Sequence, residues 1–143
     1  MTVLDTNVVS ALMHSTPDPV VVSWLDAQPS QSVWITSICV FEILYGLNIL
    51  PGGKRRKALQ QAFEQVLTRE FEGRVLDFDT IAAHEAAIIA ARLKASGRPI
   101  EMRDVQIAGI VVARRGTLAT RNTKHFLDTG IAWVNPFEFT GGA

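Results

Sequence analysis

Residues 2–7 have the sequence Thr-Val-Leu-Asp-Thr-Asn, and this stretch decides the fold class. Its first three residues are β-branched or apolar and predict a short buried strand. Asp5 follows directly, and either Thr6 or Asn7 is expected to cap a helix that runs to about Met13. The chain therefore opens with a strand that ends on a carboxylate and turns at once into a helix.

The same alternation of strand and helix continues to the other end of the chain. Further short strands are predicted over 33–35, 75–78, 117–120 and 131–134. Helices are predicted over about 18–25, 36–46, 54–67, 79–93 and 103–115. This order favours an α/β fold with three layers, α/β/α, whose central, mostly parallel sheet has four to five short strands. No linker or repeat divides residues 1–143, which are expected to form a single domain.

The charges of the chain are segregated along the sequence. Of the 143 residues, 48% are apolar and 20% are charged, which is enough apolar residues for one core, and the formal net charge is zero. Residues 1–53 contain four acidic residues and no Lys or Arg, whereas residues 92–125 contain eight Lys or Arg and two acids. The net charge of zero excludes a uniformly basic protein, but the basic segment 92–125 favours binding to a polyanion.

Cysteine and hydropathy patterns favour a cytoplasmic location. The single cysteine, Cys39, lies in an apolar run without metal-ligand spacing, which predicts a buried structural thiol in a reducing compartment. We find no signal-peptide pattern, and no apolar run approaches the roughly 20 residues that span a bilayer. No membrane association is therefore expected.

Three carboxylates have apolar neighbours at positions where a parallel sheet binds ligands. Asp5 follows the first strand, Glu42 lies on the helix after the second strand, and Asp104 lies near the start of a later helix. If the three converge, their repulsion raises their pKa values unless a cation lies among them. A hard cation such as Mg²⁺ or Mn²⁺ prefers such oxygen ligands and can activate a water against a phosphodiester. Each carboxylate on its own also fits a helix cap or a surface charge.

Several segments together resemble one family. They are Val3-Leu4-Asp5-Thr6-Asn7-Val8-Val9, the stretch from Thr36 to Gly46, Asp104 to Ile110, Leu118 to Phe126, and Val134 to Phe137. In these segments the chain resembles PIN-domain proteins of the VapC/FitB type, the toxin half of bacterial toxin–antitoxin pairs. The resemblance implies a PIN-like α/β/α domain and an endoribonuclease that needs Mg²⁺ or Mn²⁺. It also implies a cognate antitoxin, a homodimer, and operator DNA contacted only through the antitoxin.

The resemblance also implies roles for individual residues. Asp5, Glu42 and Asp104 correspond to the family's acidic metal ligands and are the expected catalytic residues. Residues expected to position the ligands or the substrate are Thr6, Asn7, Ser37, Thr120, Arg121 and Asn122, and the candidate RNA contacts are Lys124 and His125. For Ser37, a helix cap and a hydrogen bond to a metal-bound water are equal alternatives. Many members have a fourth acid where this chain has Asn122 or His125, so we expect one metal ion rather than two.

Two other functions stay open at this point. The chain could act mainly as a binding partner in an antitoxin–toxin repressor complex at operator DNA, with weak or no nuclease activity. Alternatively, Asp5 could serve a phosphotransfer or receiver-like domain. Asn7 counts against haloacid-dehalogenase-type chemistry, which needs a second Asp at that position, and the acidic pair of a receiver does not precede Asp5.

Overall fold

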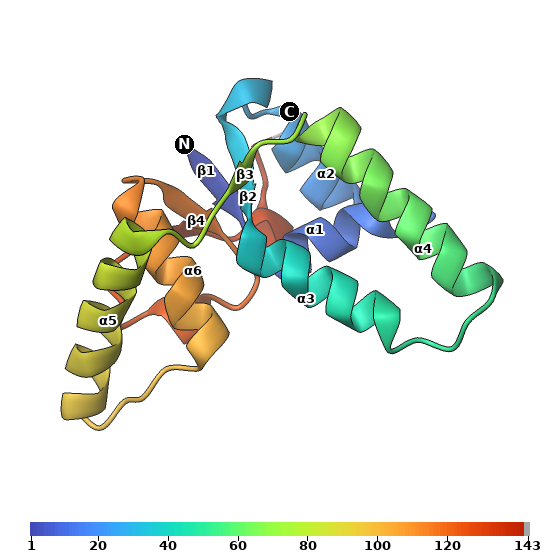
Figure 1. The fold of residues 1–143 in the computed structure, drawn as a ribbon. Coiled ribbons are helices and arrows are strands. Elements are labelled where there is room, and N and C mark those ends of the chain that lie inside the picture. Colours follow the sequence, from blue (N-terminus) through green and yellow to red (C-terminus); the bar gives the residue numbers. More distant parts are fainter. Residues whose placement is uncertain (142–143) are drawn as a thin grey trace.

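The computed structural model describes residues 1–141, in which helices and short strands alternate (Figure 1). The strands are β1 (Thr2–Leu4), β2 (Val33–Thr36), β3 (Val75–Leu76), β4 (Thr117–Ala119) and β5 (Ala132–Val134). The α-helices are α1 (Thr6–Met13), α2 (Pro19–Asp26), α3 (Ser37–Asn48), α4 (Lys54–Gln65), α5 (Thr80–Ala95) and α6 (Met102–Ala113). Four shorter helical turns are η1 (Ser30–Ser32), η2 (Val66–Glu70), η3 (Thr123–Phe126) and η4 (Pro136–Glu138).

The central sheet has the strand order β3-β2-β1-β4-β5, and each pair of neighbouring strands in the described chain is parallel. Val3 of β1 pairs with Trp34 on one side and with Leu118 on the other. The chain builds outward from β1 to β3 and then returns to the opposite side of β1 with β4. The strand order therefore reverses between β1 and β4, where Asp5 and Thr120 follow the two strands.

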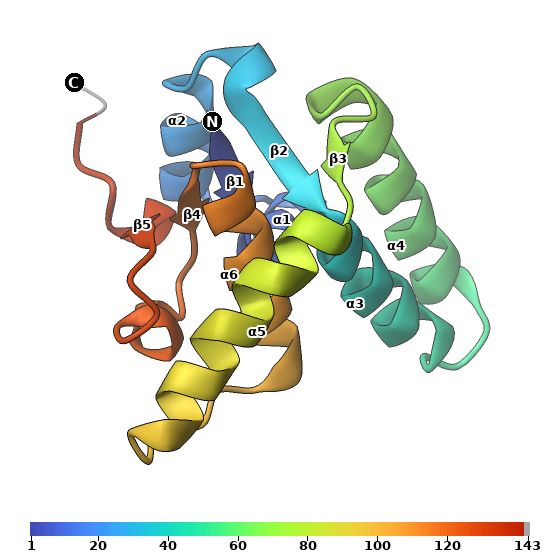
Figure 2. The ribbon, with the colours of Figure 1, turned by 60° about the vertical axis from the view of Figure 1, so that its left-hand side comes forward.

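Helices cover both faces of the sheet, as the α/β/α prediction requires (Figure 2). Because successive strand residues point to opposite faces, neighbouring residues enter different cores. Val3 and Leu118 pack against α5 and α6, whereas Leu4 and Ala119 lie in the core formed with α1 to α4. The predicted three-layer fold is confirmed, and all pairings in its five-stranded sheet are parallel within the described residues.

The helices α5 and α6 approach each other closely at Gly109. A Cβ atom built on Gly109 would lie 2.5 Å from the backbone oxygen of Ala82 and 2.7 Å from the Cβ of Ala86. Only a glycine fits this approach without a shift of one helix. The contact holds α6 against α5 and so sets the position of Asp104 in the first turn of α6.

Two predicted helix ends differ from the structure. The cap of α1 is Asp5 rather than Thr6 or Asn7, because its carboxylate accepts a hydrogen bond from the backbone N–H of Thr6. The helix α3 continues past Gly46 to Asn48. Leu47 is buried in the core, so tertiary packing outweighs the poor helix propensity of the glycine before it.

The burial of Cys39 agrees with the expectation from the sequence. The thiol of Cys39 is fully buried, and this burial raises its pKa to about 12, as expected for an unreactive structural cysteine. Within residues 1–141, none of the helices combines the length and the apolar character needed to span a membrane.

Candidate active site

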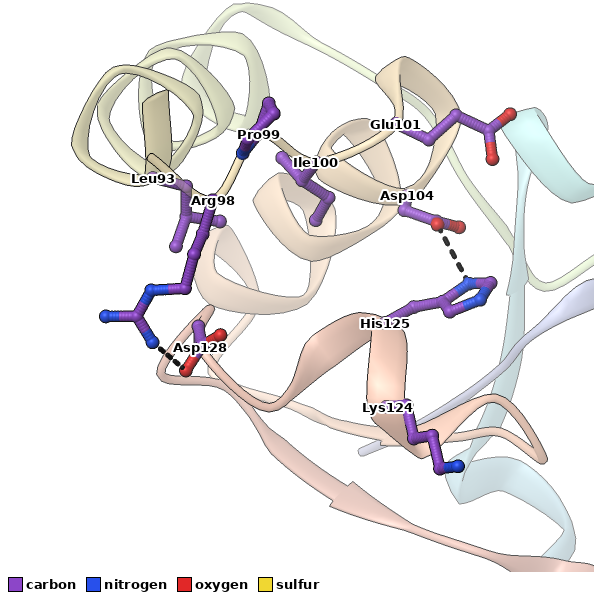
Figure 3. Close-up of a pocket in the computed structure, with 9 residues that line it drawn as sticks. All are labelled: Leu93, Arg98, Pro99, Ile100, Glu101, Asp104, Lys124, His125 and Asp128. Carbon is purple, nitrogen blue, oxygen red and sulfur yellow. Dashed lines mark ion pairs between the residues drawn. The ribbon is translucent and has the colours of Figure 1, made fainter. Parts of the chain in front are cut away.

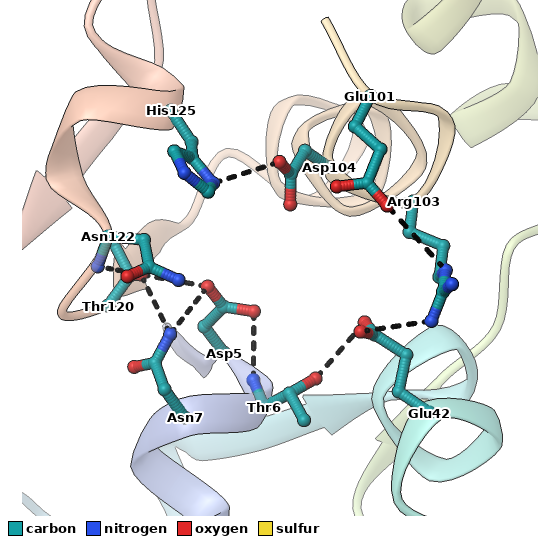
Figure 4. Close-up of polar contacts among 10 residues, drawn as sticks. All are labelled: Asp5, Thr6, Asn7, Glu42, Glu101, Arg103, Asp104, Thr120, Asn122 and His125. Atoms are coloured by element: carbon teal, nitrogen blue, oxygen red, sulfur yellow. Dashed lines mark hydrogen bonds and ion pairs between the residues drawn. The ribbon is translucent and has the colours of Figure 1, made fainter. Parts of the chain in front are cut away.

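The carboxylate of Asp5 lies at the carboxyl end of β1 with 5% of the residue exposed. Three groups donate hydrogen bonds to it (Figure 4). The backbone N–H of Thr6 donates to Oδ1 at 2.8 Å, while the hydroxyl of Thr120 and the amide of Asn7 donate to Oδ2 at 2.8 and 3.2 Å. Asp5 is therefore fixed by neutral donors from α1 and from the segment after β4.

Thr120 and Asn7 connect Asp5 to the loop that follows β4. The buried hydroxyl of Thr120 also accepts a hydrogen bond from the backbone N–H of Asn122 at 3.0 Å. The Asn7 side-chain oxygen accepts one from the backbone N–H of Arg121 at 2.9 Å. The guanidinium of Arg121 lies over the ring of Phe137, 4.1 Å from its centroid. The expected positioning residues around Asp5 thus form one hydrogen-bonded network.

Glu42 reaches the same region from α3. Its Oε1 accepts a hydrogen bond from the hydroxyl of Thr6 at 3.1 Å, and its Oε2 lies 3.6 Å from the guanidinium of Arg103. Burial is the main cause that raises the pKa of Glu42 above its ordinary value, and the charges of Asp5 and Asp104 raise it further. The hydrogen bond from the Thr6 hydroxyl and the charge of Arg103 lower the pKa of Glu42.

Asp104 comes from the first turn of α6 and pairs with a histidine. Its Oδ2 lies 3.1 Å from Nδ1 of His125, which belongs to η3. Burial again is the largest cause that raises the pKa of Asp104, the charges of Asp5 and Glu101 add to it, and His125 lowers it. Arg103 and His125 therefore each contact one of the two half-buried acids.

The three carboxylates point toward one region between β1, α3 and α6 (Figure 4). The charge of Asp5 raises the pKa of both Glu42 and Asp104, so the three lie within electrostatic reach of one another. As placed, no three His, Cys, Asp or Glu side chains among residues 1–141 form a group that could hold a metal ion directly. Mg²⁺ usually keeps several waters and binds one or two carboxylates, so this set of oxygen donors fits a hydrated divalent ion.

Comparisons with known proteins identify the family. The model of the PIN domain matches residues 2–131. The chain belongs to the PIN-domain family.

The relatives of this PIN domain are of the VapC/FitB type. The chain is 40% identical to VapC ribonuclease Y4jK of Sinorhizobium fredii, over 96% of this chain and 99% of that protein. It is 35% identical to toxin FitB of Neisseria gonorrhoeae over the same shares of both chains. Among solved structures, a chain of FitAB bound to a DNA fragment matches with a TM-score of 0.87 and 34% identity over 100% of both chains. These matches confirm the resemblance and the PIN-like fold expected from the sequence.

Ser37 lies outside the network around Asp5 in this PIN domain. The hydroxyl of Thr36, not Ser37, caps α3 by accepting a hydrogen bond from the backbone N–H of Cys39 at 3.0 Å. Ser37 instead accepts a hydrogen bond at 3.2 Å from the backbone N–H of Phe78, which follows β3. The capping alternative for Ser37 is therefore wrong, because Thr36 already occupies that position.

The two candidate RNA contacts lie beside Asp104, on the side away from Glu42. Lys124 and His125 are exposed residues of η3 and line a pocket of about 320 Å³ that Asp104 borders (Figure 3). Arg103 was not singled out by the sequence as a partner of Glu42. It is one of eight cations in residues 92–125, and only the packing of α6 beside α3 distinguishes it from the others.

Proposed function

We propose that this PIN domain is a metal-dependent endoribonuclease and the toxin component of a type II toxin–antitoxin pair. The observation that supports it most is the convergence of Asp5, Glu42 and Asp104 at the point where the strand order reverses. The name of the relative VapC ribonuclease supports RNA as the substrate class. RNA as the substrate supports a cytoplasmic location.

In this proposal, the three carboxylates surround one hydrated Mg²⁺ or Mn²⁺ ion and would hold it partly through its waters. When bound, such an ion lowers the pKa of a coordinated water and offsets the negative charge that develops on the phosphoryl oxygens. Asp5 is the best-fixed ligand, because three hydrogen bonds hold its side chain. Asn122 contributes no negative charge where many family members have an acid, which favours a single ion.

The chain's own polar residues orient the acids and attract the substrate. Thr6 contacts both Asp5, through its backbone N–H, and Glu42, through its hydroxyl, so one residue sets the relation between two ligands. Three acids alone repel RNA. Arg103, which is 43% exposed, and the exposed Lys124 supply positive charge on either side of the carboxylates and favour the approach of a phosphodiester backbone.

We also propose a cognate antitoxin as the protein partner. One matching solved structure is FitAB bound to a DNA fragment, which supports the proposal that operator DNA is contacted through the antitoxin. A largely apolar groove of about 260 Å³ runs beside Glu42 between α1, α3 and α4, with Ile43, Leu47 and Leu59 in its lining. Such a groove suits an apolar segment of a partner.

The exposed side of α3 supports the proposal that the protein forms a homodimer. Phe41, Tyr45 and Ile49 are 58%, 52% and 66% exposed, and the rings of the first two stack with centroids 6.0 Å apart. Large apolar side chains that gather on one exposed face mark an interaction surface.

Cleavage of RNA by the purified protein tests the proposed function. We expect RNA to be cut in Mg²⁺ or Mn²⁺ and to stay intact in EDTA, and we expect Asp5→Asn to lower the rate at least about 100-fold. Asp18→Asn is the matched control, because Asp18 also caps a helix through one backbone N–H but belongs to α2. Cleavage that persists in EDTA or in Asp5→Asn contradicts the metal mechanism.

The second candidate function is a binding partner in a repressor complex with little nuclease activity. The apolar groove beside Glu42 favours it, because a partner that fills the groove covers one side of the carboxylate site. A wild-type protein that forms an operator-binding complex with its antitoxin, yet leaves RNA intact in Mg²⁺ and Mn²⁺, would establish this alternative.

A further inference from the structure

A second pocket adjoins the carboxylates on the side away from the apolar groove (Figure 3). Its volume of about 320 Å³ falls within the roughly 300–1,000 Å³ of pockets that bind small ligands. It lies between η3 and the connection from α5 to α6. The apolar part of its lining consists of Leu93, Pro99 and Ile100. The polar part consists of Arg98, Glu101, Asp104, Lys124, His125 and Asp128.

A short ion pair lies at the end of this pocket that is remote from Asp104. The guanidinium of Arg98 lies 2.8 Å from Oδ1 of Asp128, and the two side chains are 61% and 48% exposed. An exposed pair of this kind contributes little to stability. It does place a hydrogen-bond donor beside an acceptor at the mouth of a pocket.

The segment that presents Asp128 is firmly anchored. The guanidinium of Arg92 on α5 donates hydrogen bonds to the carbonyl oxygens of Asp128 and Thr129 at 3.1 and 2.9 Å. The buried hydroxyl of Thr129 donates to the carbonyl oxygen of Phe126 at 2.6 Å. These contacts fix the backbone that carries Asp128, which lowers the entropic cost of ordering this segment when a ligand binds.

The charges around the pocket favour an uncharged ligand. Three carboxylates line it, those of Glu101, Asp104 and Asp128, against the two fixed cations Arg98 and Lys124. With three carboxylates and two such cations in its lining, the pocket suits an uncharged group better than a free phosphate or a polyphosphate. A nucleobase carries no charge, offers N–H groups to carboxylates and stacks on flat or apolar side chains, for which His125 and the apolar lining provide a surface.

We propose that this pocket binds an unstacked guanine next to the scissile phosphate and that Arg98 and Asp128 determine this base preference. The inference rests on the proposed ribonuclease function, because the pocket borders Asp104. Guanine offers two neighbouring N–H groups to a carboxylate and an adjacent carbonyl oxygen to a guanidinium, whereas the other three bases offer the carboxylate only one such group. Lys124, which has no ion pair within the described chain, is left to contact the RNA backbone.

Binding of oligonucleotides in EDTA, where the proposed nuclease is inactive, tests the pocket independently of catalysis. Short single-stranded RNA oligonucleotides that differ in one base are titrated into the full chain in EDTA, and affinity is measured by fluorescence anisotropy. We expect the guanine oligonucleotide to bind about tenfold more tightly than the others, and Arg98→Ala and Asp128→Asn to remove this preference.

Arg114→Ala provides the matched control. Arg114 forms a comparably exposed ion pair with Asp79 at 3.3 Å, but it lies at the far end of α6, about 15 Å along the helix from Asp104. Its variant is expected to keep the preference for guanine. Equal affinity of the wild type for all four bases, an unchanged preference in Arg98→Ala and Asp128→Asn, or an equal loss in Arg114→Ala each overturns the inference.

Mapping of cleaved RNA ends separates this inference from the proposed function. If the wild type cuts RNA, guanine is expected at one position beside the cut, and Arg98→Ala is expected to relax that position while cleavage continues. Cleavage without any base preference at that position overturns the pocket assignment and leaves the nuclease intact. Absence of cleavage overturns the nuclease, and the titrations still decide whether the pocket selects guanine.

Discussion

Replacement of Thr120 by valine tests whether the network around Asp5 serves the proposed chemistry. Valine keeps the branched shape and removes only a hydroxyl, which donates to Asp5 at 2.8 Å and accepts from the backbone N–H of Asn122 at 3.0 Å. A hydrogen bond to a charged group contributes about 1.5–3 kcal/mol, and a buried group left without a partner costs about 1–3 kcal/mol. Because Thr120 is fully buried, we expect the free energy of unfolding to fall by about 2–4 kcal/mol.

The same change is expected to weaken metal binding. Groups that orient a metal ligand typically contribute about 10–100-fold to affinity or activity. We therefore expect Thr120→Val to lower both the affinity for Mn²⁺, measured by calorimetry, and the rate of RNA cleavage by about 10–100-fold. Unfolding in urea, followed by circular dichroism in EDTA, measures the loss of stability separately.

Thr129→Val is the control for Thr120→Val. Thr129 is also buried, and its hydroxyl donates to a backbone carbonyl oxygen at 2.6 Å, outside the network around Asp5. This variant is expected to lose about 1 kcal/mol of stability and to bind Mn²⁺ like the wild type. If Thr120→Val also binds Mn²⁺ like the wild type and loses stability alone, the hydroxyl is structural and the assignment of Thr120 to the site fails.

Two further predictions concern helix packing and pH. Gly109→Ala is expected to lower the free energy of unfolding by about 1–3 kcal/mol, because its Cβ would lie 2.5 Å from the backbone oxygen of Ala82. Gly46→Ala is the control, because no atom lies within 4 Å of its new Cβ, and it is expected to raise the free energy of unfolding by up to about 1 kcal/mol. Both variants are measured by urea unfolding. An equal change in stability in the two variants would contradict the close packing at Gly109. In EDTA, stability is expected to fall as the pH rises from the ordinary carboxyl range through the raised pKa values of Glu42 and Asp104, since the folded protein binds these protons more tightly than the unfolded chain. The Glu42→Gln, Asp104→Asn double variant should reduce that slope, and an unchanged slope would show that other groups cause it.

Features with local causes could be predicted from the sequence. The helix starts at Asp18 and Asp79 were expected, and both side chains accept a backbone N–H of the first turn, as capping residues do. The end of α3 at Gly46 was predicted wrongly, because the burial of Leu47 in the core is a tertiary effect without a local signal. Likewise, Arg74 bonds the carbonyl oxygens of Val33, Ser30 and Glu70, and no pattern in the sequence indicates this contact.

The residues of the candidate site also divide into those that the sequence predicts and those that it does not. The three acids could be predicted together because the rule for parallel sheets specifies where strand ends meet, and the family resemblance selected the same residues. The basic residues that pair with Glu42 and Asp104 could not be predicted. Arg103 reaches Glu42 only through the packing of α6 beside α3, and His125 reaches Asp104 only because η3 folds back against α6. The sequence therefore indicates which groups belong to the site, and the tertiary structure decides which of them neutralise each other.

These pairings explain how a chain with no net charge suits both a cation and RNA. Glu42, from the first 53 residues, which contain no Lys or Arg, is paired with Arg103 from the basic segment, and Asp104 is paired with His125. Asp5 differs from both, because its contacts in the described chain are to neutral donors and no cation lies within ion-pair distance. An ion that binds Glu42 or Asp104 competes with an existing partner, whereas Asp5 offers an uncompensated charge. In the proposed function, Asp5 is therefore the residue whose replacement is expected to weaken metal binding most.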